Sequence, residues 1–413
     1  MHSMAKRVPI SFSFSVSSVA VISVLSVALA GPASRPAELP LPVDARQESE
    51  LLREAGPGFQ IKRTPHFLVA FNTPRAVVDE LAARLEETHH SVYRFVDTVG
   101  IDARRPARRL EVLFFNEREE YEQYAAKLRF PAGGTYGVYH EATNRSAFFN
   151  VHNEPQLQAL HAEILDAREN LQELNRLLSS MKGNGPLILT YADGRRETLT
   201  RTQAKKRLED AQRELKTLDG KRVNYSGRIN RTVIQHEAAH QVLFNAGVHV
   251  RGGANPKWIV EGLACLFETP PSEAGTGIAA INQYRLKDFR SAVAEESGKR
   301  VLRAEDFLAA IKAGRFVSPE RLVSDPRVFF ERGQHGATVY AMTWSLTHYL
   351  LRRRPRDLAG YLKEISQREP GRAVTPDEEL SLFEKHFGPL DDAFLRQWGG
   401  FVLQLPYRAP GGL

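Results

Sequence analysis

Hydrophobic and polar positions change their spacing along the chain, first near residue 155 and again near residue 220. The first stretch mixes short apolar runs with helical repeats. It predicts strands and helices in alternation: strands within 59–71, a helix at 74–99, a strand at 110–115, a helix at 117–128 and a β-hairpin of 135–139 with 146–151. The third stretch has the helical period almost throughout and predicts helices at 278–293, 304–313, 334–353, 357–366, 376–386 and 390–403. This order predicts an α+β fold, in which a mixed sheet precedes an all-helical C-terminal lobe.

The stretch between these two parts repeats apolar residues every three or four positions. The repeat covers 157–181 and returns over 208–218, with charged residues between the apolar ones. Such heptads predict an antiparallel helical (coiled-coil) hairpin. Leu187–Tyr191 and Arg196–Leu199 flank an Asp-Gly pair and predict a small β-hairpin at its tip. We therefore expect residues 155–219 to be an insertion, and a partner-binding arm, a dimer seam and a self-contained spacer all remain open for its role.

The N-terminal segment is typical of an export signal. Lys6 and Arg7 precede an apolar run, and Ala28-Leu29-Ala30 before Gly31 fits a small-x-small cleavage site. Residues 1–30 are therefore expected to be a signal peptide and the mature chain to be periplasmic or extracellular. A retained segment that anchors the chain in a membrane is the alternative, since the run is long enough to span. No cysteine follows the run, so no lipoprotein anchor is expected.

Residues 31–57 are rich in proline and charge, which favours a flexible lead-in with one short helix over 45–54. The single cysteine, Cys265, excludes an intramolecular disulfide. The net charge of +7 includes basic runs at Arg104-Arg105, Arg108-Arg109 and Arg352–Arg354. We interpret these runs as solvated faces or as weak attraction to anionic envelope polymers, and we expect no nucleic-acid partner.

The chemistry of the chain concentrates in His236-Glu237-Ala-Ala-His240, which lies within a helical apolar pattern. Four residues advance a helix by one turn, so the two histidines face the same way, about 40° apart. Two imidazoles in this arrangement can occupy two positions around one Zn²⁺ ion. Glu237 lies beside them and is placed to hold a water next to the metal.

A second motif can complete this site. Gly252-Gly-Ala-Asn-Pro256 predicts a turn, after which Trp258–Glu268 predicts a helix that folds back on the first. Glu261, near the start of that helix, can then supply a third ligand and leave the fourth position for water. A polar helix face that carries two histidines without a metal is the alternative.

These motifs resemble the gluzincin metallopeptidases, the thermolysin-like zincins, and most closely the small peptidase MA-like domains of largely uncharacterised function. The resemblance rests on His236-Glu-Ala-Ala-His240, on Pro256-x-Trp258-x-x-Glu261-Gly262-x-Ala264 and on Tyr340-Ala-x-x-Trp344, and it covers 59–150 and 223–405. It implies that His236, His240 and Glu261 are zinc ligands and that Glu237 is the general base. The metzincin pattern does not fit, because Leu243 and Ala246 stand where it requires glycine and histidine.

The same resemblance bears on several further positions. Many gluzincins carry an aspartate four residues after the ligand glutamate, where this chain has Cys265, so the partner that orients His236 stays unassigned. Tyr340 is the candidate to stabilise the oxyanion and His335 the second, although helical spacing explains Tyr340 nearly as well as a core residue. Trp258 is expected to pack. The strand Ala147–Val151 is expected to line the substrate cleft or only to complete the sheet.

The sequence thus predicts a zinc metallopeptidase of the cell envelope, in which Glu237 activates a zinc-bound water against a peptide bond. Its expected partner is a peptide or protein substrate. The alternative is a non-catalytic interaction protein on a zincin scaffold that binds partners through the helical hairpin. The presence of Glu237 favours the enzyme, because a scaffold has no use for it.

Overall fold

The computed structural model describes residues 41–130, 133–180, 185–190, 196–269, 280–331 and 336–408. The predicted signal peptide and the first part of the lead-in lie outside these residues. Within them, no helix combines the length and the apolar character that crossing a bilayer requires.

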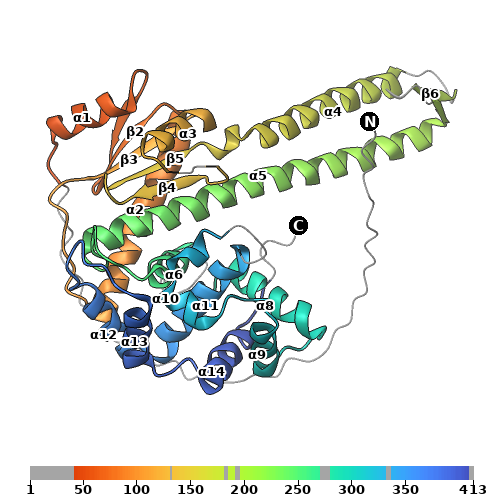
Figure 1. The fold of residues 1–413 in the computed structure, drawn as a ribbon. Helices are drawn as coiled ribbons and strands as arrows, with labels where there is room; N and C mark the ends of the chain where they lie inside the picture. The colour runs from red at the N-terminus through yellow and green to blue at the C-terminus, as the bar shows by residue number, and fades with distance from the viewer. Residues whose placement is uncertain are drawn as a thin grey trace. The chain divides into compact units, whose positions relative to one another are not determined.

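A five-stranded mixed sheet forms the N-terminal part and confirms the α+β class (Figure 1). Its strands follow the order β1-β2-β3-β5-β4. They span Gln60–Arg63 (β1), Phe67–Phe71 (β2), Leu110–Phe115 (β3), Gly137–His140 (β4) and Arg145–Phe149 (β5). β2, β3 and β5 are parallel neighbours, whereas β1 and β4 pair antiparallel at the two edges.

The two faces of the sheet are covered by different helices. Alternate residues of the central strands point to opposite faces, so Val112 joins one cluster of buried residues and Leu113 the other. The first face packs on α2 (Arg75–Val99) and the C-terminal half of α5 (Arg201–Ala246), and the second on α1 (Ala45–Ala55) and α3 (Arg118–Lys127). The helix expected within the lead-in is thus α1, which contacts β1 and β2 and is fixed to the sheet by the buried Leu51.

The edge strand next to α5 is β4, not the strand that the sequence suggested. Residues 147–149 belong to β5, which lies between β3 and β4 and is hydrogen-bonded on both sides. An interior strand offers no free backbone groups to a peptide. Residues 147–149 therefore complete the sheet, which is the second of the two alternatives, and the edge strands are β1 and β4.

The helical hairpin is present, but its second helix does not end before the metal motif. α4 (Pro155–Ser180) packs along α5 in antiparallel direction, with β6 (Leu187–Thr190) and β7 (Arg196–Leu199) at the far end (Figure 1). α5 continues without a break from Arg201 to Ala246. The sequence predicted separate helices, so the boundary at 219/220 falls inside one helix. We call α4, β6, β7 and residues 201–230 the arm.

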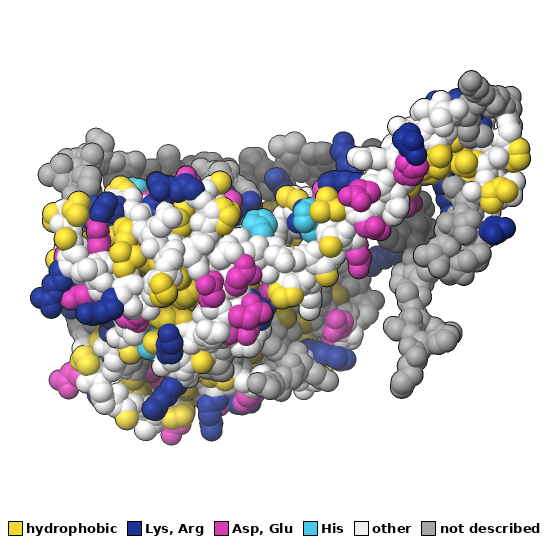
Figure 2. Space-filling model, turned by 90° about the horizontal axis from the view of Figure 1, so that it is seen from above, with side chains coloured by type: hydrophobic (Ala, Val, Ile, Leu, Met, Phe, Trp, Pro, Cys, Tyr) yellow, Lys and Arg dark blue, Asp and Glu magenta, His cyan; other side chains and the backbone are white. Residues whose placement is uncertain are grey.

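The arm has a small apolar core of its own near its tip. Leu178, Leu199, Ala204 and Leu208 are buried together there, apart from the two sheet clusters. Leu218, which the heptads place inside, is instead 41% exposed. Charged side chains lie between hydrophobic ones along the arm, and hydrophobic side chains gather near β6 and β7 (Figure 2).

The C-terminal lobe is helical, as expected. It consists of α6 (Lys257–Phe267), α8 (Gln283–Ser297), α9 (Ala304–Lys312), α10 (Pro319–Ser324), α11 (Gly336–Arg353), α12 (Pro355–Ile365), α13 (Pro376–Phe387) and α14 (Asp392–Leu403). Its core is continuous with the α2 face of the sheet. α6 is the link, because it contacts α5 on one side and α11 on the other.

Candidate metal centre

The position of α5 against the sheet is set by polar anchors next to the histidines. Gln241, directly after His240, is fully buried and donates to the backbone oxygens of Glu111 and Asn144 at 2.9 and 3.0 Å. Its own oxygen accepts a hydrogen bond from the Ser146 hydroxyl at 3.0 Å. Buried polar groups that are fully paired fix a helix in one register, so His236 and His240 are held at a defined depth.

α6 is held from the other side by a close contact with α11. Every residue of α6 from Trp258 to Phe267 is buried. A β-carbon on Gly262 would lie 2.0 Å from the Thr347 hydroxyl oxygen and 3.2 Å from a Thr343 methyl carbon. Only glycine permits this approach, and the neighbouring Glu261 is thereby directed at α5.

Three ligand atoms converge between the two helices. His236 Nε2 lies 3.0 Å from Glu261 Oε2 and 3.1 Å from His240 Nε2, and His240 Nε2 lies 3.6 Å from Glu261 Oε2. Atoms placed tetrahedrally around Zn²⁺ at about 2.1 Å are about 3.4 Å apart. The two rings meet edge-on at 86°, so their nitrogen lone pairs can point to one place. The donor set and its spacing therefore fit a metal ion, and these residues form a candidate metal-binding group.

Charges around the cluster favour an ionised Glu261. The Lys257 ammonium lies 2.6 Å from Glu261 Oε1, the oxygen that does not face the histidines. Burial alone would raise the pKa of Glu261, but Lys257 and the two imidazoles lower it well below its usual range. Lys257 thus occupies one carboxylate oxygen and leaves Oε2 as a single ligand atom.

Glu268 is the partner of His236 that sequence reasoning missed. Its Oε1 lies 3.0 Å from His236 Nδ1, and Arg285 and Asn282 hold the same carboxylate at 2.6 Å each. Burial opposes ionisation, but Arg285 and His236 lower the pKa of Glu268 to about 2. A carboxylate on Nδ1 keeps the proton there and leaves Nε2 free for a metal. Glu268 follows Glu261 by two helical turns, and this spacing was the available signal.

Cys265 lies beside the same histidine but belongs to the weaker of the two candidate metal groups. It forms a second group with His236 and Glu268 whose ligand atoms are close together. Burial raises the pKa of the Cys265 thiol, however, and Glu268 is already paired with Arg285. A protonated thiol is a poor metal ligand, so the His236, His240 and Glu261 group is the better metal site.

Glu237 is attached to the edge of the sheet. Its Oε2 accepts a hydrogen bond from the Tyr139 backbone N–H of β4 at 2.7 Å. β4 can come this close because residue 137 is glycine, where a β-carbon would lie 2.8 Å from Val233 and 2.6 Å from Phe148. Glu237 therefore has one oxygen fixed by the edge strand beside the histidines.

The structure also brings Tyr340 to the cluster. Its ring lies 6.3 Å from the His236 ring and within 5.1 Å of the Arg285 guanidinium. The charge of Glu261, together with burial, raises the pKa of Tyr340. His335 lies outside the described residues. Trp258 packs, fully buried, and donates to the Tyr361 hydroxyl at 3.2 Å.

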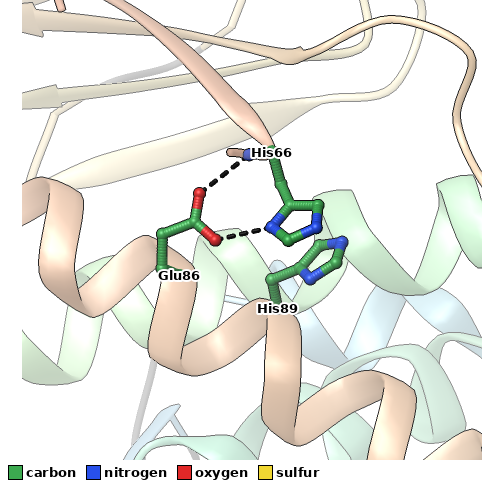
Figure 3. A group of neighbouring side chains, drawn as sticks. All are labelled: His66, Glu86 and His89. Atoms are coloured by element: carbon green, nitrogen blue, oxygen red, sulfur yellow. Dashed lines mark hydrogen bonds and ion pairs between the residues drawn. The ribbon is translucent and has the colours of Figure 1, made fainter. Parts of the chain in front are cut away.

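A second group of two histidines and a glutamate lies at the start of β2 and on α2 (Figure 3). Glu86 accepts from the backbone N–H of His66 at 2.9 Å and pairs with its ring nitrogen Nδ1 at 2.6 Å. His89 lies under the His66 ring, with the centroids 3.7 Å apart and the planes 16° from parallel. His89 is buried, and its Nδ1 has no hydrogen-bond partner among the described residues.

Comparison with known proteins gave a match for only one part of the chain. A family model described as "Protein of unknown function (DUF1570)" matches residues 230–371. This range contains His236, His240, Glu261, Glu268 and Tyr340, and it excludes the sheet and most of the arm. Neither the curated proteins nor the solved structures that were compared gave a match.

Proposed function

We propose that this protein is a zinc-dependent metallopeptidase of the gluzincin type that acts after export from the cytoplasm. The observation that carries the proposal is the convergence of His236, His240 and Glu261 on one point, with the Glu237 carboxylate beside them. A structural role for the two histidines would explain their contact. It would not explain a carboxylate fixed next to them by the edge of the sheet.

Zn²⁺ held by these three side chains would polarise a carbonyl group and lower the pKa of a nearby water toward neutrality. Glu237 accepts the proton of that water on Oε1, since Tyr139 N–H already occupies Oε2. The same carboxylate then carries the proton to the amine that leaves. An extended peptide could pair with the remaining outward backbone groups of β4, since Tyr139 N–H is taken by Glu237, and so present its carbonyl to the site.

Tyr340 is the residue we assign to the oxyanion. Its raised pKa keeps it a phenol at neutral pH, so it is a hydrogen-bond donor. A donor that meets the negative oxygen only as it forms stabilises the transition state more than the substrate.

Glu237→Gln tests the proposal directly, with Glu295→Gln, an exposed position on α8, as the matched control. The amide keeps the volume and can still accept from Tyr139, so fold and zinc content should stay unchanged. Peptide cleavage, measured on a substrate found by library screening with the unmodified protein, should fall by about 10²–10⁴-fold. A Glu237→Gln protein that cleaves at the full rate would exclude this mechanism.

A non-catalytic interaction protein remains the second candidate, because the arm exposes large apolar side chains. Ile188 near the tip is 61% exposed, and Val223 and Leu218 are 48% and 41% exposed. They are spread along the arm, so a partner that binds them would lie along its length. Zinc content without cleavage of any library peptide, in both the unmodified protein and Glu237→Gln, would favour this candidate.

A further inference from the structure

A large cavity lies next to the metal centre rather than in it. It has a volume of about 1050 Å³ and is open to solvent. Three segments supply most of its lining: the loop 104–109 before β3, the C-terminal end of α5 with the residues up to 251, and the segment 366–370 after α12. We call this cavity the basic groove, because arginine is its most frequent lining residue.

Some of these arginines are neutralised within the protein. Arg108 pairs with Asp44 at 2.9 Å, and Arg368 binds both oxygens of Glu379 at 2.6 and 2.8 Å. Arg145 pairs with Glu111 at 2.5 Å. These three guanidinium groups build the walls and are not available to a ligand.

Other arginines keep an uncompensated charge. Arg104 and Arg251 are exposed, and no ion pair of the described residues involves them. Arg109 donates to the backbone oxygens of Pro42 and Thr64 at 2.6 and 2.7 Å, which are neutral partners. The groove therefore carries an excess of positive charge in positions that a ligand can reach.

His249 forms a polar floor in this groove. It is only 1% exposed, and neither ring nitrogen has a hydrogen-bond partner among the described residues. Burial, with the nearby His240, lowers the pKa of His249 to about 3, so the ring is neutral and offers one donor and one acceptor. Buried polar atoms are rarely left unpaired, which indicates that a ligand or water completes them.

The groove continues the edge of the sheet. Phe244, one turn after His240, lines it and contacts the rings of Tyr139 on β4 and His249 at 5.4 and 5.1 Å. The turn that follows β4 supplies Thr143 and Asn144 to the lining. An extended chain that pairs with β4 at the metal centre would therefore pass into the groove.

We propose that the basic groove binds carboxylate side chains of an acidic peptide, several residues away from the bond that the metal centre cleaves. This inference rests on the proposed function and specifies its substrate class. Guanidinium forks match carboxylates in two-point hydrogen bonds. Glu50, Glu111 and Glu369 also line the groove, and they would repel a uniformly charged polymer more than a peptide with spaced acidic residues.

The test measures peptide binding by fluorescence anisotropy on the full chain with Glu237→Gln, which prevents turnover. Two labelled peptides of equal length carry either three glutamates or three glutamines at the same positions. Arg104→Gln and Arg251→Gln are the test variants, added to Glu237→Gln singly and together. Arg300→Gln, an exposed position before α9 and outside the lining, is the matched control.

We expect the acidic peptide to bind about tenfold more tightly than its amide counterpart at low salt. Arg104→Gln and Arg251→Gln together should abolish this preference and leave the binding of the amide peptide and the zinc content unchanged, whereas Arg300→Gln should have no effect. Equal binding of the two peptides, or a preference that survives both substitutions, would overturn the proposal. Inorganic polyphosphate that binds more tightly than the acidic peptide would also overturn it.

The outcome is separable from that of the proposed function. Zinc content and cleavage by the unmodified chain report on the metal centre alone. A chain that cleaves peptides without preferring acidic ones would refute the groove assignment only. A chain that prefers acidic peptides, depends on Arg104 and Arg251 for it and never cleaves would refute the enzyme and uphold the groove.

Discussion

Two groups of the same composition, two histidines and a glutamate, lie in the described part of this molecule. In the group on α5 and α6, the rings of His236 and His240 stand at 86° and their Nε2 atoms are 3.1 Å apart. In the group on β2 and α2, the rings of His66 and His89 are stacked at 16°. The lone pair of a ring nitrogen lies in the ring plane, so edge-on rings can share one metal ion and stacked rings send their lone pairs in parallel directions.

The carboxylates around the two groups also differ in which histidine nitrogens they leave free. In the first, Glu268 occupies the outer nitrogen of His236 and leaves the inner one to a metal. In the second, the Glu86 carboxylate itself binds Nδ1 and the backbone N–H of His66. Both of its oxygens are therefore already paired with His66. A metal site is thus defined by where its partners place the lone pairs, and not by its residue types.

The largest expected effect is the loss of metal from one group only. His236→Ala, His240→Ala or Glu261→Ala removes one of three ligands and should reduce zinc from one ion per chain to nearly none. His66→Ala and Glu86→Ala are the matched controls and should still contain one zinc ion per chain. Elemental analysis after gel filtration gives the answer. Two ions per chain, or metal lost from His66→Ala, would show that the stacked group also binds metal.

Glu268→Gln should have an intermediate effect. The amide keeps the shape but loses the charge that holds the proton on His236 Nδ1, and such changes lower metal affinity by about 10–100-fold. Competition with a zinc chelator measures this affinity. Glu86→Gln, the corresponding change in the stacked group, should leave it unaltered. An unchanged affinity in Glu268→Gln would mean that Arg285 and Asn282, rather than His236, are the reason for this carboxylate.

A smaller difference should appear in the pH dependence of stability without metal. Burial, together with the charge of His66, lowers the pKa of His89 to about 3, while Glu86 opposes this shift. Between these pH values the unfolded chain binds a proton at His89 that the folded chain does not bind. The contribution of a neutral His89 to stability is therefore present above about pH 6.5 and is lost as the pH falls toward 3. Glu86, whose pKa is also lowered, acts in the same direction below its own ordinary value.

His236 should show the opposite sign. Burial opposes the shift, but Cys265, Glu261 and Glu268 raise the pKa of His236 well above its usual value. Its contribution is therefore complete below about pH 6.5 and is lost as the pH rises through the raised pKa. Urea unfolding of the unmodified chain, His89→Phe and His236→Gln in a chelator separates the two. The difference in the free energy of unfolding between the unmodified chain and each variant should change with pH by up to about 1.4 kcal/mol per pH unit. The change should have opposite signs for His89→Phe and His236→Gln. Changes in the same direction would contradict the contrast.

The parts of this contrast that could be predicted from the sequence are those set by helix periodicity. One turn of helix places His236 beside His240 in any structure, and the turn at 252–256 with the helix after it pointed to Glu261. Glu268 was missed because its contact to His236 depends on how α6 lies against α5, which Gly262 and α11 determine. The stacked group was not predicted at all, since His66 and His89 come from different elements and no local spacing relates them.

The continuity of α5 was missed for a similar reason. Gly220 and Gly227 each disfavour a helix by about 1 kcal/mol, so the local sequence favours a break. The structure offsets this cost through packing on α4 and through Asp219, which pairs with Arg168 at 2.6 Å and with Arg222 at 3.0 Å. Contacts between helices that are distant in sequence thus override local propensity.

The smallest effect, and the last prediction, concerns the outer arm, whose removal should disturb neither histidine group. Residues 169–218 contain the whole apolar cluster of the arm tip, and Arg168 and Asp219 face each other across the two helices. A short Gly-rich turn between Arg168 and Asp219 should therefore leave a folded chain with one zinc ion and an unfolding midpoint within a few degrees of the full protein.

The matched comparison is a deletion at the boundary that the sequence suggested. Removing 155–219 also takes Leu157, which is buried with the second sheet cluster, the cluster against which Ile229 of α5 packs. A buried leucine contributes about 2–5 kcal/mol, so this longer deletion should be clearly less stable while the shorter one is not. If the shorter deletion is insoluble or free of metal, the outer arm supports the metal centre through the continuous α5 helix, and the arm and the centre form one cooperative unit.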